Sequence, residues 1–172
     1  REEVYNLPSY ATYRGSHPQV DIQVLFSRGL KRLNFSQLKI FNELRIKLSE
    51  KSVALCAGFW RGGTDGKIFV DGLAALAPKD LDSWLSIYRL AVLMELDQEY
   101  FPAVGAEDLK AGLNIIMESS NDIDKKRLNN LLASISNASS ADACWCMKKI
   151  LNNQHLEVSV REKFLRSLVY IL

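Results

Sequence analysis

The residues best suited to chemistry lie in a glycine-rich stretch, CAGFWRGGTDGKIFVDG, at positions 56–72. Its Gly66-Lys67 pair suggests a phosphate-binding loop, a motif in which a first glycine stands five positions earlier and Ser or Thr follows the lysine. The residue five positions before Gly66 is Arg61, and Ile68 follows the lysine, so no hydroxyl is available to hold a magnesium ion. The G-x-G-x-x-G dinucleotide pattern is absent as well. A nucleotide site is therefore not predicted, and no cofactor is expected.

Turn formation explains the same glycines. Gly62 and Gly63 suit the end of a helix, because glycine adopts the left-handed conformation easily, and Asp65-Gly66 is a common turn and hairpin signal. The flanking runs VALCAGFW and KIFV fit either helices or two short paired strands, so residues 53–70 are left open. Aromatic and charged side chains near an exposed turn are typical of protein contacts. The candidate partner-binding residues are Trp60, Arg61, Lys67 and, further along the chain, Trp145.

Spacing disfavours metal and nucleophile chemistry. A metal site would draw on Cys144, Cys146 and His155, but residues two apart on a helix point about 200° away from each other. Burial as small apolar side chains explains the cysteines better. No local signature would activate a Cys–His pair, and both histidines, His17 and His155, stand in polar loops. We therefore predict no metal site and no catalytic residue, and do not expect an enzyme.

Paired carboxylates also have a structural explanation. Glu107-Asp108 and Asp122 with Asp124 fall at the starts of predicted helices. There a carboxylate satisfies free N–H groups and lies at the positive end of the helix dipole. We expect helix capping rather than acid–base catalysis at these positions.

Composition is that of an ordinary globular domain. The chain has 172 residues, of which 48% are hydrophobic and 24% charged, enough for one core and short for two. No apolar run approaches the roughly 18–20 residues of a membrane span, so membrane insertion is not expected. Three cysteines, an odd number, and a polar N-terminus without a signal peptide favour a reducing compartment, which predicts a cytoplasmic protein. Because the sequence begins with Arg1, we expect a piece of a longer protein.

Charge is unevenly distributed, although the net charge is only +2. From Arg28 to Lys51 seven basic residues stand against two acidic ones, whereas from Glu95 to Asp124 eight acidic residues stand against one basic. A basic stripe with aromatic residues nearby is typical of a nucleic-acid backbone binder, although a solvated face is the commoner explanation. The residues of this alternative are Arg28, Lys31, Arg32, Lys39, Arg45 and Lys47.

The spacing of apolar residues predicts an all-α fold. Residues 1–19, rich in tyrosine and proline, predict an extended N-terminal arm, and residues 20–172 a single α-helical domain. That domain should hold about seven or eight helices in an irregular bundle. The short period of the last four segments leaves stacked helical hairpins open in the C-terminal half. Those four segments are 107–118, 122–135, 141–151 and 160–172.

Three positions carry more specific expectations. The run 81–96 is apolar nearly all round, so we expect it at the centre of the bundle. Within it, Arg89 would need a carboxylate partner if buried. Ser159 and Glu162 form a capping-box pattern, which predicts the start of the last helix.

These observations favour a non-enzymatic α-helical interaction domain, an adaptor or scaffold cut from a larger intracellular protein or assembly. We expect it to bind a protein partner or another copy of itself. The alternative is a helical nucleic-acid-binding domain that uses the basic segment 28–51.

Overall fold

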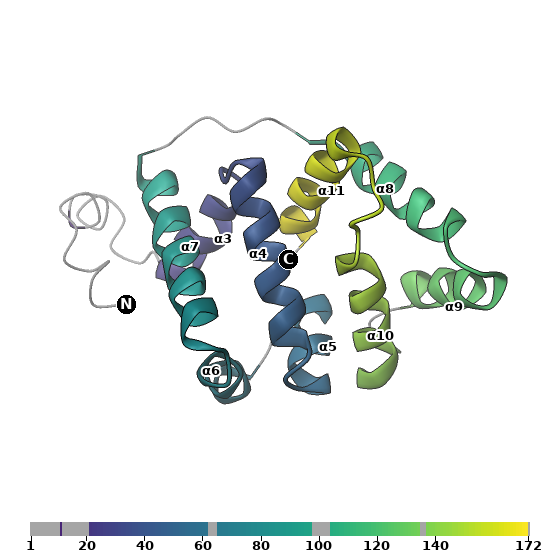
Figure 1. Ribbon diagram of the computed structural model, residues 1–172, viewed down its shortest axis with the longest axis horizontal. Coiled ribbons are helices and arrows are strands. Elements are labelled where there is room, and N and C mark those ends of the chain that lie inside the picture. The colour runs from purple at the N-terminus through teal and green to yellow at the C-terminus, as the bar shows by residue number, and fades with distance from the viewer. Residues whose placement is uncertain (1–10, 12–20, 62–64, 98–103, 135–136, 172) are drawn as a thin grey trace.

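The computed structural model describes residues 11, 21–61, 65–97, 104–134 and 137–171. Within these ranges it holds nine α-helices and no strand, and the helices pack into a compact bundle (Figure 1). The all-α prediction is confirmed. The helices are α3 (Ile22–Leu30), α4 (Phe35–Ser49), α5 (Val53–Arg61), α6 (Gly66–Ala74), α7 (Pro78–Leu96), α8 (Ala106–Glu118), α9 (Asp122–Ala133), α10 (Ser140–Leu151) and α11 (Val158–Ile171).

The ninth helix comes from the segment that the sequence left open. Residues 53–70 hold all of α5 and the start of α6, so the hairpin alternative is wrong. The carboxylate of Asp65 accepts hydrogen bonds from the amides of Lys67 at 2.9 Å and Ile68 at 3.2 Å. Asp65-Gly66 therefore begins a helix, because an aspartate oxygen can satisfy the free N–H groups of a first turn.

The starts of two other helices differ in how their side chains are used. Asn34 caps α4 in a reciprocal capping box with Gln37, through bonds of 3.0 and 2.8 Å. At α11 the predicted box is wrong, because the helix begins one residue before Ser159 and encloses it. Glu162 instead lies 3.5 Å from the guanidinium of Arg166, one helical turn further on. The carboxylate of Glu162 thus lies near the buried guanidinium of Arg166 instead of capping the start of the helix.

The helix at the centre of the bundle is α4 rather than α7. α4 packs against α5, α7, α10 and α11, and Figure 1 shows it between two groups of helices. The expectation for residues 81–96 is wrong because Asp82, Ser86 and Arg89 recur at helical spacing and form an exposed face. Leu85 on that face is 52% exposed. Arg89 is exposed too, so it is not the buried cation that the apolar run suggested.

One end of the molecule is an apolar seam between α3 and α7. Gly29 allows this close approach: a Cβ built there would lie 1.8 Å from the carbonyl oxygen of Ala91. Aromatic rings fill the space beside it, with Phe26 stacked on Tyr88 at 4.6 Å and 6.4 Å from the ring of Trp84. Glycine is required here because the backbone of α7 occupies the place of any side chain.

At the other end, helices far apart in the sequence pair with one another. α10 packs most extensively on α5, and α11 on α8, where Gly112 lies against the ring of Phe164. Consecutive helices therefore do not stack as repeated hairpins, and the bundle is irregular. Arg166 of α11 closes the carboxyl end of α3 by donating hydrogen bonds to the carbonyls of Lys31 and Leu33, both at 2.9 Å.

Two expectations stay predictions. Apart from Ala11, the arm at residues 1–19 lies outside the described residues. The single-domain prediction for residues 20–172 has no independent test. Among the described helices none combines the length and apolar character needed to cross a membrane.

Candidate interaction surfaces

The basic segment does not form one continuous surface. Arg45 is only 3% exposed and belongs to the core, which corrects its place among the surface cations. Arg32 is paired with Glu95 at 2.8 Å, and Lys47 with Asp80 at 2.6 Å. The basic segment is thus partly neutralised by α7, through Glu95 at the start of the acidic segment and through Asp80 outside it.

The remaining cations of the segment have mixed environments. Arg28 is exposed in the last turn of α3, where a cation is favourable for the helix dipole. Lys31 is half-buried. The ammonium of Lys39 lies 4.9 Å from the ring centroid of Phe35, one turn earlier on α4. The row of six cations is therefore split between exposed, paired and buried positions.

Arg45 lies in a seam between α4, α5 and α10. Its guanidinium stands 5.7 Å from the ring of Phe41 and 5.5 Å from the ring of Phe59, and its Nη2 is 3.8 Å from the sulfur of Met147. Within the part of the chain that the structure describes, it forms no ion pair with a carboxylate. Burial lowers the pKa of Arg45 to about 9, because a cation removed from water is less stable.

Other polar side chains share this α4–α5–α10 seam. Asn42 donates a hydrogen bond to the carbonyl of Leu151 at 3.0 Å, while its own Oδ1 is buried and finds no partner among the described atoms. The hydroxyl of Ser49, also buried, donates to the carbonyl of Ile46 at 2.6 Å. A buried polar group without a hydrogen-bond partner, or a buried charge without a counter-ion, costs free energy. Asn42 and Arg45 therefore lower the stability that this seam gains from burying apolar surface.

A disulfide closes the same seam. Cys56 of α5 and Cys144 of α10 are joined, with their Cα atoms 5.0 Å apart. This corrects the expectation that the cysteines are reduced, because two of the three pair across 88 residues of sequence. Cys146 is free and buried, and burial raises the pKa of its thiol to about 12. Among the described residues no group of three or more His, Cys, Asp or Glu side chains is arranged to hold a metal ion.

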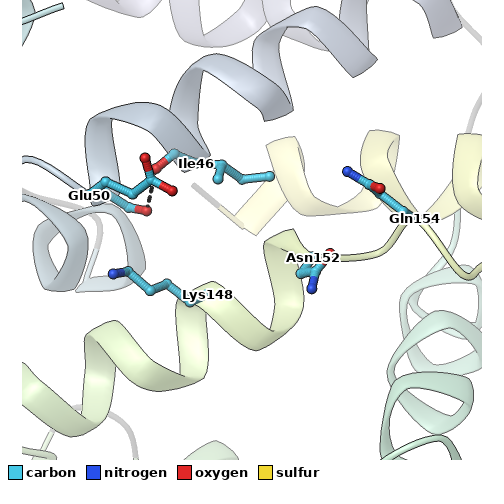
Figure 2. Close-up of a pocket in the computed structure, with 6 residues that line it drawn as sticks. Ile46, Glu50, Lys148, Asn152 and Gln154 are labelled. Carbon is cyan, nitrogen blue, oxygen red and sulfur yellow. Dashed lines mark hydrogen bonds between the residues drawn. The ribbon is translucent and has the colours of Figure 1, made fainter.

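A shallow pocket of about 330 Å³ opens between the carboxyl ends of α4 and α10. Figure 2 shows Ile46 and Glu50 on the α4 side, Lys148 and Asn152 on α10, and Gln154 on the loop that follows. The broken line is the 2.6 Å hydrogen bond that the Ser49 hydroxyl donates to the Ile46 carbonyl. The lining is polar and open to solvent, and its groups have no arrangement typical of acid–base or nucleophilic catalysis.

Trp145 holds α9 against α10. The guanidinium of Arg127 lies 4.2 Å from its ring and the ammonium of Lys149 lies 5.6 Å away. Both cations are also paired, Arg127 with Asp142 and Lys149 with Asp124, each at 2.6 Å. The ring is therefore half-buried under intramolecular cations, and its role as a partner-binding residue stays a prediction.

The carboxylate of Asp142 belongs to the same cluster. Arg127 donates a hydrogen bond to one of its oxygens, and the Ser139 hydroxyl donates to the other at 2.8 Å. These bonds, with Arg127 the largest cause, hold the pKa of Asp142 below its usual value. The run Cys144-Trp145-Cys146 thus faces two neighbours within the chain, α5 through the disulfide and α9 through the tryptophan.

The predicted capping carboxylates occupy helix starts. Asp108 accepts a hydrogen bond from the amide of Gly105 at 3.0 Å, and Asp122 and Asp124 lie in the first turn of α9. His155 is exposed as expected and lies 3.3 Å from the hydroxyl of Ser119, whereas His17 is outside the described residues.

Of the remaining partner-binding residues, Trp60 and Arg61 end α5 and Lys67 lies in α6. The side chains of Trp60 and Arg61 are outside the described residues. Lys67 is exposed and pairs with Asp71, one turn away, at 2.8 Å. Val70, 61% exposed, and Ile68, 36% exposed, lie on opposite sides of this pair, so α6 shows solvent two opposite charges flanked by apolar side chains.

The inner face of α6 is anchored on two neighbours. Phe69 packs against Trp84 of α7, with ring centroids 5.7 Å apart. Gly72 is buried against α5, where an added Cβ would meet the side chain of Leu55 at 2.5 Å. The orientation of the outer face is therefore set by α5 and α7 together.

No protein-family model, curated protein or solved structure matches this chain. Its function has to be inferred from its own residues. The sequence reasoning missed the Cys56–Cys144 pair, the burial of Arg45 and the role of Arg166. Of these, Arg45 had a visible signal, because it falls on the apolar stripe of α4 between Phe41 and Leu48.

Proposed function

We propose that this chain is a non-enzymatic α-helical interaction domain, and that a second copy of the chain binds to the outer face of α6. The observation that carries the proposal is the exposure of Val70 and Ile68 beside the Lys67–Asp71 pair. Exposed apolar side chains rimmed by charges are typical of protein contacts. An adaptor or scaffold role within a larger intracellular assembly fits such a surface.

The face is complementary to itself. When two α6 helices lie antiparallel across a two-fold axis through their middle, Lys67 of one copy faces Asp71 of the partner subunit. In the same arrangement Ile68 and Val70 lie on opposite sides of this charged centre, because residues two apart on a helix point in nearly opposite directions. Two-fold contacts of this kind need a surface that carries both halves of each interaction, and α6 carries both. Because one nine-residue helix buries little area, we expect a weak association, with a dissociation constant of about 10 µM or higher.

The proposal that the domain is not an enzyme rests on the structural contacts of its cysteine thiols and aspartate carboxylates. Cys56 and Cys144 bond to each other, Cys146 is buried with a raised pKa, and Asp108 and Asp124 bind at helix starts and to lysines. Each group thus has a structural role that accounts for its position. The nucleic-acid alternative stays untested, and the burial of Arg45 and the pairing of Arg32 and Lys47 give it no support.

A cytoplasmic location is part of the proposal, and the disulfide counts against it, because disulfides are rare in a reducing compartment. In a reducing compartment Cys56 and Cys144 would be held as thiols for much of the time. In an oxidising one they would stay joined. Mass spectrometry of the chain alkylated inside intact cells distinguishes the two states directly.

Sedimentation velocity of the oxidised chain from about 1 µM to about 500 µM tests the interaction. We expect the mean mass to rise with concentration, and Val70→Asp to abolish the rise. Val158→Asp is the matched control, because Val158 is 69% exposed on α11, away from α6. A monomer at every concentration, or equal effects of the two aspartates, would overturn the proposal.

A charge exchange tests the orientation. Lys67→Asp should weaken self-association, because it places two carboxylates opposite each other in the antiparallel pair. The double variant Lys67→Asp with Asp71→Lys restores complementary charges and should recover the wild-type constant. Failure of the double variant to recover it would rule out the antiparallel arrangement.

A further inference from the structure

We infer that the Cys56–Cys144 disulfide is a redox latch on α5: when it is reduced, α5 leaves the α4–α5–α10 seam and α6 loses its support. The inference rests on the proposed function for its consequence, the loss of self-association through α6. The opening of α5 itself stands on the structure of the seam and is measured separately.

Apart from the disulfide, few large side chains among the described residues of α5 hold it in place. It is a nine-residue helix, too short to be stable alone in water. Among the side chains of α5 that the structure describes, the fully buried ones are Leu55, Cys56 and Ala57, of which only leucine is large. Phe59 is half-buried, and Val53 is 53% exposed. The covalent bond to Cys144 is therefore a major part of what holds α5 on α10.

The closed seam also buries a charge without an anion. Phe59 of α5 covers the guanidinium of Arg45 at 5.5 Å, with Phe41 and Met147 on its other sides. Ring faces compensate a buried cation only in part. Departure of α5 removes Phe59 from the guanidinium and returns water to Arg45, so the hydration of this cation favours the open state.

α5 in turn supports α6. The side chain of Leu55 fills the space above Gly72, which is the buried contact between the two helices. When α5 leaves the seam, α6 loses its closest contact and keeps those with Trp84 of α7 and with Leu48 of α4. The outer face with Val70 is then less firmly oriented, and the self-complementary arrangement is weakened.

The chemical step is thiol–disulfide exchange with a dithiol reductant. One thiolate of the reductant attacks a sulfur of the pair, forming a mixed disulfide and releasing the other protein sulfur. The second thiol of the reductant then displaces the protein, leaving the reductant as a cyclic disulfide. The two protons of the dithiol end on Cys56 and Cys144. Since both cysteines are buried, with Cys144 5% exposed, the reaction requires a brief opening of the seam and should be slow.

Hydrogen–deuterium exchange of the oxidised chain and the chain reduced with dithiothreitol tests the latch. Dilute protein, at about 1 µM, keeps association out of the measurement. We expect reduction to speed exchange of the α5 and α6 amides about tenfold or more beyond any change in α3, α7, α8 and α11, whose exchange changes only with the stability of the whole fold. Equal rates in the two states would overturn the latch. So would a uniform loss of protection in all helices, since the bond would then stabilise the whole fold rather than α5.

Two variants complete the test. Cys56→Ser with Cys144→Ser should reproduce the reduced pattern without reductant, and Cys146→Ser should leave the oxidised pattern intact because the free cysteine is outside the pair. Sedimentation at high concentration then separates the two proposals. If reduction opens α5 but the oxidised chain is monomeric, the interaction proposal fails and the latch stands. If the oxidised chain associates and reduction changes neither exchange nor association, the latch fails alone.

Discussion

The α3–α7 seam and the α4–α5–α10 seam join helices by different means. In the first, Gly29 brings two backbones together and aromatic rings surround the contact. In the second, a disulfide joins helices whose interface also holds Arg45 and Asn42. The first seam is stabilised by close packing, whereas the second buries polar groups and depends on a covalent bond.

The same small bundle thus contains two kinds of buried helix contact. Close packing of apolar groups gives a contact that opens only with the whole fold. A polar seam with a covalent bond gives a contact whose stability changes with one chemical event. Figure 1 shows α3 and α7 at one side of α4, with α5 and α10 at the other, so the two kinds of contact meet on one helix.

Removal of the disulfide should have the largest effect. Cys56→Ser with Cys144→Ser opens a loop of 88 residues, and chain entropy alone predicts a loss of about 4–5 kcal/mol in the free energy of unfolding. Urea denaturation followed by circular dichroism measures it, with Cys146→Ser as the control. A loss below about 1 kcal/mol would show that the bond contributes little to the second seam.

A substitution at Gly29 should have the next largest effect, now in the first seam. Gly29→Ala puts a Cβ 1.8 Å from the carbonyl oxygen of Ala91, so α3 and α7 must separate. We expect a loss of about 2–3 kcal/mol in the same denaturation assay. Gly66→Ala is the control, because its Cβ meets nothing within 4 Å. Equal stabilities of the two variants would contradict the close-packed picture of the first seam.

The two seams also differ in how far the sequence predicted them. The spacing of Ile22, Leu25 and Phe26 puts them on one helix face, so the apolar stripe of the first seam is predictable, whereas its contact with α7 is not. The second was missed because a disulfide between Cys56 and Cys144 is a contact of the folded chain, and sequence spacing does not fix cysteine connectivity.

Arg45 shows a different kind of limit. It sits on the apolar stripe of α4, yet its residue type assigned it to the surface, since arginine is rarely fully buried. In the candidate interaction surface, Lys67, expected near an exposed turn, lies exposed on a helix, whereas the exposed apolar side chains of α6 were not singled out. Which side of α6 faces solvent depends on contacts with α5 and α7, and these arise only in the fold.

Replacement of Arg45 by an apolar residue should stabilise the second seam. Arg45→Met removes a buried charge that has no anion among the described residues and keeps a flexible apolar stem. We expect a gain of about 1–2 kcal/mol at pH 7 in urea denaturation. Arg28→Met, at an exposed position, should change stability by less than about 0.5 kcal/mol.

The pH dependence of this difference has a definite sign. Because burial lowers the pKa of Arg45 to about 9, the unfolded chain holds that proton more tightly than the folded chain. The stability of the wild type should therefore rise relative to Arg45→Met as the pH increases above about 9. A gap that stays constant from pH 7 to pH 10 would mean that Arg45 is hydrated in solution.

Substitutions in the contact of α9 with α10 should have the smallest effect on stability. This contact is polar like the second seam, but its charged groups face solvent, so losing one should cost little stability. Arg127→Gln removes the principal cause of the lowered pKa of Asp142, and NMR titration of that carboxyl should show its pKa rising toward the usual value. Ser139→Ala removes the second cause and should give a smaller rise. A larger rise for Ser139→Ala would mean that the Arg127–Asp142 pair is open in solution, and that Trp145 has a face free for a partner.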